Sequence, residues 1–436
     1  MSTILVALVL LLVMIVFLAI GAWIPVAIAV TSWVGLVIFS DHDALVNLAN
    51  SWWSSSASYT LASLPLFVWM GEILFRTKLS EQMFNGLSPW LNWLPGRLMH
   101  VNILGCGIFG SVSGSSAATC ATIAKSALPE LTKRGYDERI TLGSLSTAGT
   151  LGILIPPSIT MVVYAVSADV SIIRVFLAGF LPGLLLMILF SGYIVVWALM
   201  NPEKTPAAET FGWAARLASI RQLMPCIILI AFITWIMMAG YSTATEAAAY
   251  GVVASLALAW VGGSLTRQAF WESLMSATRL TAMIMFVLGA TSFLSVTMSF
   301  TGIPRALAEW VAALQLSPWS LIAVLTIIYI LLGTALDGIS MIALTTATVL
   351  PMVQAAGFDL VWFGIFIVLL VEIAEVTPPV GFNLFVLQSM TGRDSNYIAR
   401  VSLPFFMMMV IAIGIITVWP SVVTWLPDVV MAKELK

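Results

Sequence analysis

Two short stretches place oxygen-bearing side chains inside otherwise apolar parts of this chain. GSVSGSSAATC, residues 110–120, carries four serines and two glycines and no charge, and ALDGIS, residues 335–340, carries the carboxylate of Asp337. A double proline follows each stretch, at 156–157 and 378–379. Hydroxyl, carboxylate and carbonyl oxygens are ligands for a small hard cation such as sodium, and free N–H groups at helix N-termini bind anions. The two stretches therefore indicate ion binding within an apolar interior.

The composition predicts that this interior lies in a membrane. Of the 436 residues 61% are hydrophobic and 9% are charged, whereas soluble proteins carry roughly 25% charged residues. The net charge of −2 and the scattered Lys and Arg exclude nucleic acid as an expected partner. The apolar run MSTILVALVLLLVMIVFLAIGAW has no Lys or Arg before it, so we expect a retained span and not a cleaved signal peptide. We therefore expect a multi-pass protein embedded in membrane lipid.

Stretches of about 20 apolar residues, the length that crosses the hydrocarbon core, predict the transmembrane helices. They lie near 3–20, 23–39, 58–75, 172–199, 223–239, 244–263, 278–298 and 401–420. Of the 18 Lys and Arg residues, 13 fall in loops on one side of this arrangement and four on the other, with Lys125 internal to a segment. Because cytoplasmic loops carry an excess of Lys and Arg, the first set is expected in the cytoplasm and both termini outside it. The N-terminus changes sides if residues 1–39 form one tilted span.

Other apolar stretches fit the span rule poorly and belong to an internal repeat. A shift of 222 residues pairs Pro129 with Pro351, Asp137 with Asp359 and the first double proline with the second, without a gap. The Lys and Arg distribution puts the first copy's Gly-x-Asp turn in the cytoplasm and the second copy's turn on the other side. The two copies are therefore expected to be inverted. Inverted repeats with interrupted helices are typical of secondary transporters.

Each copy is predicted to form a re-entrant helical hairpin followed by an interrupted helix. The first hairpin spans 97–134 with its tip at SVSGSS, and the next helix unwinds at 149–157. The second hairpin spans 318–357 with its tip at ALDGIS, and the second break is EVTPPVG, residues 375–381. Non-helical backbone at membrane depth needs protein or a water-filled cavity around it. Close helix packing by small residues is the structural alternative, but it does not explain a tip and a break that each occur twice.

With these stretches in view, the sequence resembles the large membrane subunit, DctM type, of tripartite ATP-independent periplasmic (TRAP) transporters. The resemblance rests on GSVSGSSAATCATIAKSALPELTKRGYDERI with GTLGILIPPSITMVVYA, and on LLGTALDGISMIALTTATVLPMVQAAGFD with EIAEVTPPVGFNLFVLQSMTGRD. STATEAAAYG and LPLFVWMGEIL also fit the family pattern, so the likeness covers most of the chain. Lys125 departs from the pattern, because a small residue is usual at that position.

The resemblance implies an elevator-type sodium symporter, not an enzyme, with Na⁺ as coupling ion and no organic cofactor. The first implied sodium site consists of Ser113, Gly152, Ile155 and Pro157, and the second of Gly333, Asp337, Thr377 and Pro379. The implied substrate site lies between the tips, at Ser115, Ser116, Ser158, Gly338 and Asn383. The implied substrate is a C4-dicarboxylate, sialic acid or a similar carboxylate. The implied partners are a small four-span membrane subunit and a periplasmic substrate-binding protein, at the bacterial inner membrane.

The expected fold is an all-α polytopic membrane protein with inverted repeats, two re-entrant hairpins and two broken helices. Its expected parts are N-terminal scaffold spans with a first arm helix (1–94), the first hairpin and broken helix (95–170), scaffold spans with a second arm (171–317), the second hairpin and broken helix (318–392), and a C-terminal span (393–436). The two arms, from Lys78 and from Ile303, are amphipathic. They either brace a moving domain or pack against a partner.

Three acidic residues have both a structural and a functional interpretation. Asp337 is suited to bind an ion or substrate, or to cap a helix N-terminus. Glu246 opens a span in TATEAAA, where a capping or scaffold role is favoured. Glu375 stands three residues before the second double proline, and a coupling role and a structural one are equally supported.

Other function classes agree less well with the sequence. A membrane enzyme would need a metal motif or a nucleophile with its base, and there is no HExxH, no G-x-S-x-G and no suitably placed His. A channel or structural subunit does not account for paired broken hairpins. Among transporters, the alternative is a self-sufficient sodium/dicarboxylate symporter of the divalent-anion type, without a binding protein. Neighbouring genes for a binding protein and a small four-span protein would distinguish the two.

Overall fold

The structure is a computed structural model that describes residues 3–77, 79–207, 211–306, 309, 317–334, 336–379 and 381–431. In these residues all regular secondary structure is helical, which confirms the expected all-α class. Six helices are long and apolar enough to cross a membrane, or eight if two bent helix pairs each form one span. Large apolar side chains such as Leu8, Ile188 and Trp260 are more than half exposed. Such surfaces suit lipid and not water, as expected of a multi-pass membrane protein.

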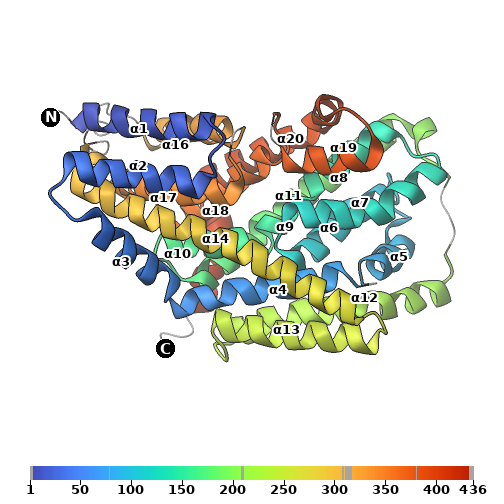
Figure 1. The fold of residues 1–436 in the computed structure, drawn as a ribbon. Helices are drawn as coiled ribbons and strands as arrows, with labels where there is room; N and C mark the ends of the chain where they lie inside the picture. The colour runs from blue at the N-terminus through green and yellow to red at the C-terminus, as the bar shows by residue number, and fades with distance from the viewer. Residues whose placement is uncertain are drawn as a thin grey trace.

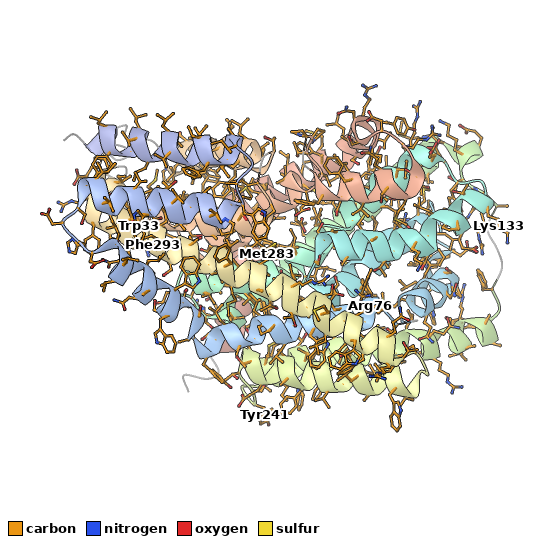
Figure 2. All side chains as sticks on the ribbon, in the orientation of Figure 1. Trp33, Arg76, Lys133, Tyr241, Met283 and Phe293 are labelled. Atoms are coloured by element: carbon orange, nitrogen blue, oxygen red, sulfur yellow. The ribbon has the colours of Figure 1, made fainter. Side chains whose placement is uncertain are left out.

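One packed group contains the N-terminal helices and three helices from the middle of the chain. Its members are α1 (Thr3–Ala19), α2 (Ile24–Phe39), α3 (Ala44–Ser56), η1 (Tyr59–Ala62), α4 (Ser63–Phe75), α12 (Trp213–Met238), α13 (Ala244–Val261) and α14 (Arg267–Thr301). The long helix α14 runs diagonally across Figure 1 and packs against α2, α3 and α4. Trp33 of α2 joins Phe293 of α14 in one apolar cluster (Figure 2).

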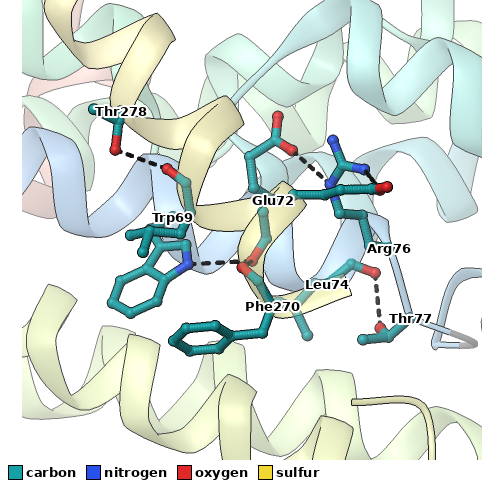
Figure 3. Close-up of polar contacts among 10 residues, drawn as sticks. Trp69, Glu72, Leu74, Arg76, Thr77, Phe270 and Thr278 are labelled. Carbon is teal, nitrogen blue, oxygen red and sulfur yellow. Dashed lines mark hydrogen bonds and ion pairs between the residues drawn. The ribbon is translucent and has the colours of Figure 1, made fainter. Parts of the chain in front are cut away.

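Polar contacts also hold α4 against the N-terminal half of α14 (Figure 3). The indole N–H of Trp69 donates to the Ser273 hydroxyl at 3.3 Å. The guanidinium of Arg76 pairs with Glu272 at 2.6 Å and with Glu72 at 3.3 Å. Partly exposed ion pairs of this kind contribute at most about 1 kcal/mol each, so apolar packing supplies most of the cohesion. The contacts fix the relative orientation of α4 and α14.

The second group is built around the two hairpins. α6 (Met99–Ser113) and α7 (Ser116–Lys133) form the first hairpin, and α16 (Pro318–Gly333) and α17 (Gly338–Ala355) form the second. In Figure 1 the arms of α6 and α7 extend to the right and those of α16 and α17 lie to the left. The other members are α8 (Glu138–Ala148), α9 (Leu151–Leu154), α10 (Ile159–Ser167), α11 (Ile172–Met200), η2 (Pro202–Lys204), α18 (Leu360–Ala374), α19 (Phe382–Thr391), α20 (Ser395–Val418) and α21 (Ser421–Met431).

Some helix boundaries of the two copies coincide under the 222-residue shift, above all those of the second hairpin arm. The bounds of α7, 116 and 133, become 338 and 355, which are the bounds of α17, and the first residue of α8, 138, becomes 360, the first of α18. Both double prolines are joined by cis peptide bonds. The second break lies at 375–381, between α18 and α19, as expected. The chain thus repeats its pattern of helix starts and interruptions.

The first interruption begins at Gly149, as expected, but it contains a short helix. α8 ends at Ala148, α9 (Leu151–Leu154) follows a turn at 149–150, and the backbone becomes extended at Ile155. Gly149 itself keeps helical backbone angles, with φ −54° and ψ −33°. A Cβ atom added to Gly149 would lie 2.7 Å from the Cβ of Cys120. The glycine therefore permits close packing of the end of α8 against α7.

The connecting helices differ from the expectation in detail. α5 (Leu79–Leu91), the first arm, packs between α12 and the hairpin helices α6 and α7, and the Trp90 indole donates to Ser219 of α12 at 3.1 Å. The second arm lies mostly outside the described residues.

α3 and α21 are helices that the span rule does not predict, because both are shorter than 20 residues. By packing, α11 and α20 belong with the hairpin group, since α11 contacts α6, α8 and α18, and α20 contacts α8 and α18. The domain boundaries stay a prediction.

Candidate functional site

The tip of the first hairpin is a compact network of hydroxyl groups. α6 ends at Ser113, Gly114 adopts a left-handed φ of 60°, and Ser115 caps α7 by accepting from the Ala118 N–H. The Ser113 hydroxyl lies 2.6 Å from the Thr119 hydroxyl and donates to the Ser115 carbonyl at 3.3 Å. Thr119 donates to the same carbonyl at 2.7 Å. Several oxygen atoms therefore converge where α6 ends and α7 begins.

The broken helix of the first copy packs directly on this tip. A Cβ atom added to Gly152 would lie 2.7 Å from the Thr119 hydroxyl and 3.2 Å from the Ser115 carbonyl. One added to Gly110 would lie 2.5 Å from the Cα of Gly152. Real Cβ atoms do not approach other atoms so closely, so α6 and α9 meet at this distance because both positions are glycine. The backbone of α9 is thereby held beside the hydroxyl network.

The structure brings together part of the expected first sodium site. Ser113 and Gly152 meet through Thr119, which the sequence analysis missed because a threonine in the first turn of a helix is an ordinary residue there. Ile155 opens the break in extended backbone, with φ −87° and ψ 121°, and Pro157 follows it, buried. Binding of sodium at these residues stays a prediction.

The second tip repeats the backbone arrangement with different chemistry. α16 ends at Gly333, and Asp337 caps α17 by accepting from the backbone N–H three residues later at 3.1 Å. A Cβ atom added to Gly333 would lie 2.2 Å from the Cβ of Ala374 on α18. One added to Gly338 would lie 2.2 Å from Val371. Both arms of this hairpin therefore meet α18 through glycine.

The other members expected in the second sodium site lie in the break that follows α18. The Thr377 hydroxyl donates to the Ile373 carbonyl at 2.6 Å, and Pro379 lies two residues further on. The capping interpretation of Asp337 is confirmed, and its role in ion binding stays a prediction. Glu246 is likewise a capping residue, since it closes a capping box with Thr243 at the start of α13.

Two of the expected substrate residues bind each other across the repeat. Ser116 of α7 donates to the side-chain oxygen of Asn383 at 3.0 Å, and the Asn383 amide donates to the Ser146 carbonyl at 2.8 Å. Asn383 is fully buried. Ser158 donates to the Ile153 carbonyl at 2.6 Å and caps α10. These contacts connect the first hairpin and α8 to the helix after the second break.

A cavity of about 190 Å³ lies between the two tips. The ends of α7, α10, α17 and α19 meet at it, and Leu280 of α14 belongs to its wall. Its polar lining includes Ser115, Ser116, Asp337, Gly338 and Glu375. Three expected substrate residues, Ser115, Ser116 and Gly338, are therefore at the cavity. Ser158 and Asn383 are not among the described residues that line it.

Two carboxylates near the second tip have buried oxygen atoms without a hydrogen-bond partner among the described residues. Oε2 of Glu375 is buried and has no hydrogen-bond partner within the described part of the chain. Glu372, one turn earlier on α18, is fully buried, and both of its carboxylate oxygens lack a partner in the same described part. A buried carboxylate without a partner is costly, and in a membrane protein it indicates a functional site. Of the two, Glu375 lines the cavity.

Hairpins and helix breaks that meet at a polar cavity inside apolar helices define a membrane transport protein. The fold is similar to that in the crystal structure of the Alcanivorax borkumensis YdaH transporter, with a TM-score of 0.62. The match covers 86% of this chain and 88% of that one at 11% sequence identity, so it concerns the fold alone.

The chain belongs to the family of the tripartite ATP-independent periplasmic transporter, DctM component, which matches residues 11–422. It is 32% identical to the C4-dicarboxylate TRAP transporter large permease protein DctM of Pseudomonas aeruginosa, over 90% of this chain and 92% of that protein. It is 27% identical to the ectoine/5-hydroxyectoine TRAP transporter large permease protein UehC of Ruegeria pomeroyi, over 96% and 98%. It is also 27% identical to the isethionate TRAP transporter permease protein DctMQ of Oleidesulfovibrio alaskensis, over 93% of this chain and 64% of that protein. The family expected from the sequence is therefore confirmed.

Proposed function

We propose that this chain is the large membrane subunit of a sodium-driven transporter that imports an organic acid across the bacterial inner membrane. The observation that carries the proposal is the single cavity at which two hairpin tips and the helices after two breaks converge. Helix ends at such a point offer carbonyl oxygens to cations and N–H groups to anions. Membership of the TRAP transporter family supports the same conclusion.

Sodium binding is proposed at both tips. At the first tip the Ser113 hydroxyl and backbone atoms of Gly152, Ile155 and Pro157 would supply neutral oxygens, with Thr119 as an added ligand. At the second tip Asp337 would supply a charged oxygen, together with Gly333, Thr377 and Pro379. Oxygen atoms of these types are the preferred ligands of hard cations. The absence of any nucleotide-binding motif such as G-x-x-x-x-G-K-[ST] is consistent with an ion gradient as the energy source.

An elevator movement is proposed for the hairpin group against the group around α14. The contacts between α4 and α14 support the group around α14 as the fixed scaffold. α5 touches both groups, since it packs on α12 and on α6 and α7. In this proposal α5 braces the moving group while the cavity between the tips travels with its substrate.

The proposed partners are a small four-span membrane subunit and a periplasmic substrate-binding protein. The family description is of one component of a tripartite transporter, and the Pseudomonas relative is named a large permease protein. The Oleidesulfovibrio relative is longer than this chain and is named DctMQ, which supports a second membrane component beside this one. These observations favour the tripartite arrangement over a self-sufficient sodium/dicarboxylate symporter.

Family membership alone does not select the substrate. The relatives are named for C4-dicarboxylates, ectoine and isethionate, which differ in charge and shape. All three carry an acid group, and this shared feature supports an organic acid as the proposed substrate class of this chain.

Uptake into proteoliposomes tests the proposal. Both membrane subunits would be reconstituted, and the loaded binding protein would be added outside. Uptake is expected to follow an inward sodium gradient without ATP. Equal uptake in choline or potassium buffer would contradict sodium coupling, and uptake without the binding protein would favour the self-sufficient symporter.

A further inference from the structure

The cavity between the tips combines positive helix ends with one unpartnered carboxylate. α7 and α17, each of 18 residues, begin at the cavity, and the first residues of α10 and α19 also line it. The N-terminus of a helix carries about half a positive charge, so the ends of α7 and α10, whose caps Ser115 and Ser158 are neutral, favour an acid group of the substrate. They account for the anionic part of an organic acid.

An acid group on the substrate does not explain why Glu375 lines the cavity. It lies at the C-terminal end of α18 and lines the same cavity, with Oε2 buried and no hydrogen-bond partner among the described residues. Asp337, the other acid of the cavity, already caps α17. No Lys, Arg or His is among the described residues of the wall. A purely anionic substrate would therefore lie beside the carboxyl group of Glu375, with no cationic side chain in the described lining to bind it.

The carboxylate belongs to one copy of the repeat. Position 375 minus 222 is 153, and Ile153 also lines the cavity. One wall therefore presents an apolar side chain where the equivalent wall presents an acid. Such an asymmetric site suits a ligand with two unlike ends.

We infer that the transported substrate is a small zwitterion, whose acid group lies at the N-termini of α7 and α10 and whose positively charged nitrogen contacts Glu375. This inference rests on the proposed function and specifies its substrate class. The volume of about 190 Å³ is below the roughly 300–1,000 Å³ of typical ligand pockets, which limits the substrate to a small molecule. A charge-assisted contact strengthens binding by about ten- to a hundredfold.

Matched ligand pairs test the inference in a binding measurement, which needs no sodium gradient. L-aspartate and succinate share a skeleton and differ in the ammonium group, as do γ-aminobutyrate and butyrate. Each compound would be titrated against the thermal stability of the assembled membrane subunits in saturating sodium. We expect the ammonium-bearing member of a pair to bind about ten- to a hundredfold more tightly.

Two isosteric variants locate the effect. Glu375→Gln is expected to abolish the preference for the ammonium-bearing member. Glu372→Gln removes a neighbouring buried carboxylate that does not line the cavity, and the preference should persist in it. Both variants retain the volume of the side chain, and their monodispersity in detergent reports on folding.

Four results would overturn the inference. In the parent protein, succinate and butyrate could bind as tightly as their ammonium-bearing partners or more tightly, or none of the four compounds could stabilise the protein. In Glu375→Gln, the ammonium preference could persist, or the variant could lose only its stabilisation by sodium. The last result would assign Glu375 to an inorganic cation. Loss of sodium-driven uptake with an intact ammonium preference would instead contradict the proposed function and leave the substrate class standing.

Discussion

The two hairpin tips share a backbone and differ in charge. At the first tip, Ser113, Ser115 and Thr119 satisfy one another through short hydrogen bonds. At the second tip, Asp337 caps α17, and the nearby Glu375 has a buried oxygen without a partner in the described chain. The first tip is neutral and internally satisfied, whereas the second is charged and incompletely satisfied.

The equivalent caps make this difference specific. Position 115 plus 222 is 337, so Ser115 and Asp337 occupy the same place in the repeat, and each caps the second arm of its hairpin. A neutral hydroxyl serves the cap as well as a carboxylate does. The two copies therefore have the same hairpin cap geometry, but only the second copy carries a negative charge at the cap, on Asp337. We expect the charged copy to dominate the electrostatic coupling to ions.

The largest effect is expected for Asp337→Asn. The amide keeps the shape and capping capacity and removes the charge, so the sodium concentration for half-maximal uptake should rise about ten- to a hundredfold, equivalent to about 1.5–3 kcal/mol. Asp359→Asn is the matched control, because Asp359 caps α18 in the same way at 2.8 Å and lies outside the cavity lining. An unchanged sodium requirement in Asp337→Asn would leave the acid as a helix cap alone.

The close approach of the first hairpin to its broken helix is tested by Gly110→Ala. The added Cβ would lie 2.5 Å from the backbone of Gly152, so the variant should lose about 1–3 kcal/mol of stability in thermal unfolding. Gly414→Ala, in the interior of α20, has open space around its Cβ and should be as stable as the parent or slightly more stable. Equal stability of the two variants would show that the close approach of α6 to α9 is not required.

A smaller effect is expected for Ser113→Ala at the neutral tip. Loss of one neutral hydroxyl costs about 0.5–1.5 kcal/mol, so the sodium requirement should rise by a factor of about two to ten. Ser111→Ala is the control, because that hydroxyl donates to the Ile108 carbonyl of its own helix at 2.7 Å. A larger shift in Ser113→Ala than in Asp337→Asn would reverse the assignment of the two tips.

The smallest effect is expected where the two copies touch at the surface. Arg393, after α19, donates to both carboxylate oxygens of Glu138 at 2.7 and 2.8 Å, and both side chains are about half exposed. Exposed pairs contribute about 0–1 kcal/mol, so Arg393→Gln should lower the unfolding temperature slightly at low salt and still less at high salt. A loss as large as that of Gly110→Ala would show that this contact organises the two copies.

The sequence predicted the helical framework because its signals are local. Long apolar stretches, the 222-residue repeat, the glycines at the tips and the double prolines fix where helices begin and end, and the second break lies at the expected residues. α3 and α21 were missed because short helices give no span signal. The short helix α9 inside the first break was not predicted, because a four-residue helix gives no sequence signal of its own.

The candidate site was predictable in its residue types but not in its contacts. The pairing of Ser116 with Asn383 joins residues 267 positions apart, and Thr119 gives no sequence signal of its own. The sequence shows that Glu375 is an acid three residues before a double proline. Only the three-dimensional structure shows that it lines the cavity and that its Oε2 has no hydrogen-bond partner among the described residues. Long-range packing decides these features.

The effect of sodium on the thermal stability of the assembled membrane subunits tests the central claim most directly. A ligand that binds the folded state raises its stability with the logarithm of the ligand concentration relative to the dissociation constant. At equal ionic strength, sodium should stabilise the parent protein relative to choline, Asp337→Asn should lose most of this shift, and Ser113→Ala should lose less. Equal unfolding temperatures in sodium and choline, or an undiminished sodium shift in Asp337→Asn, would contradict the account.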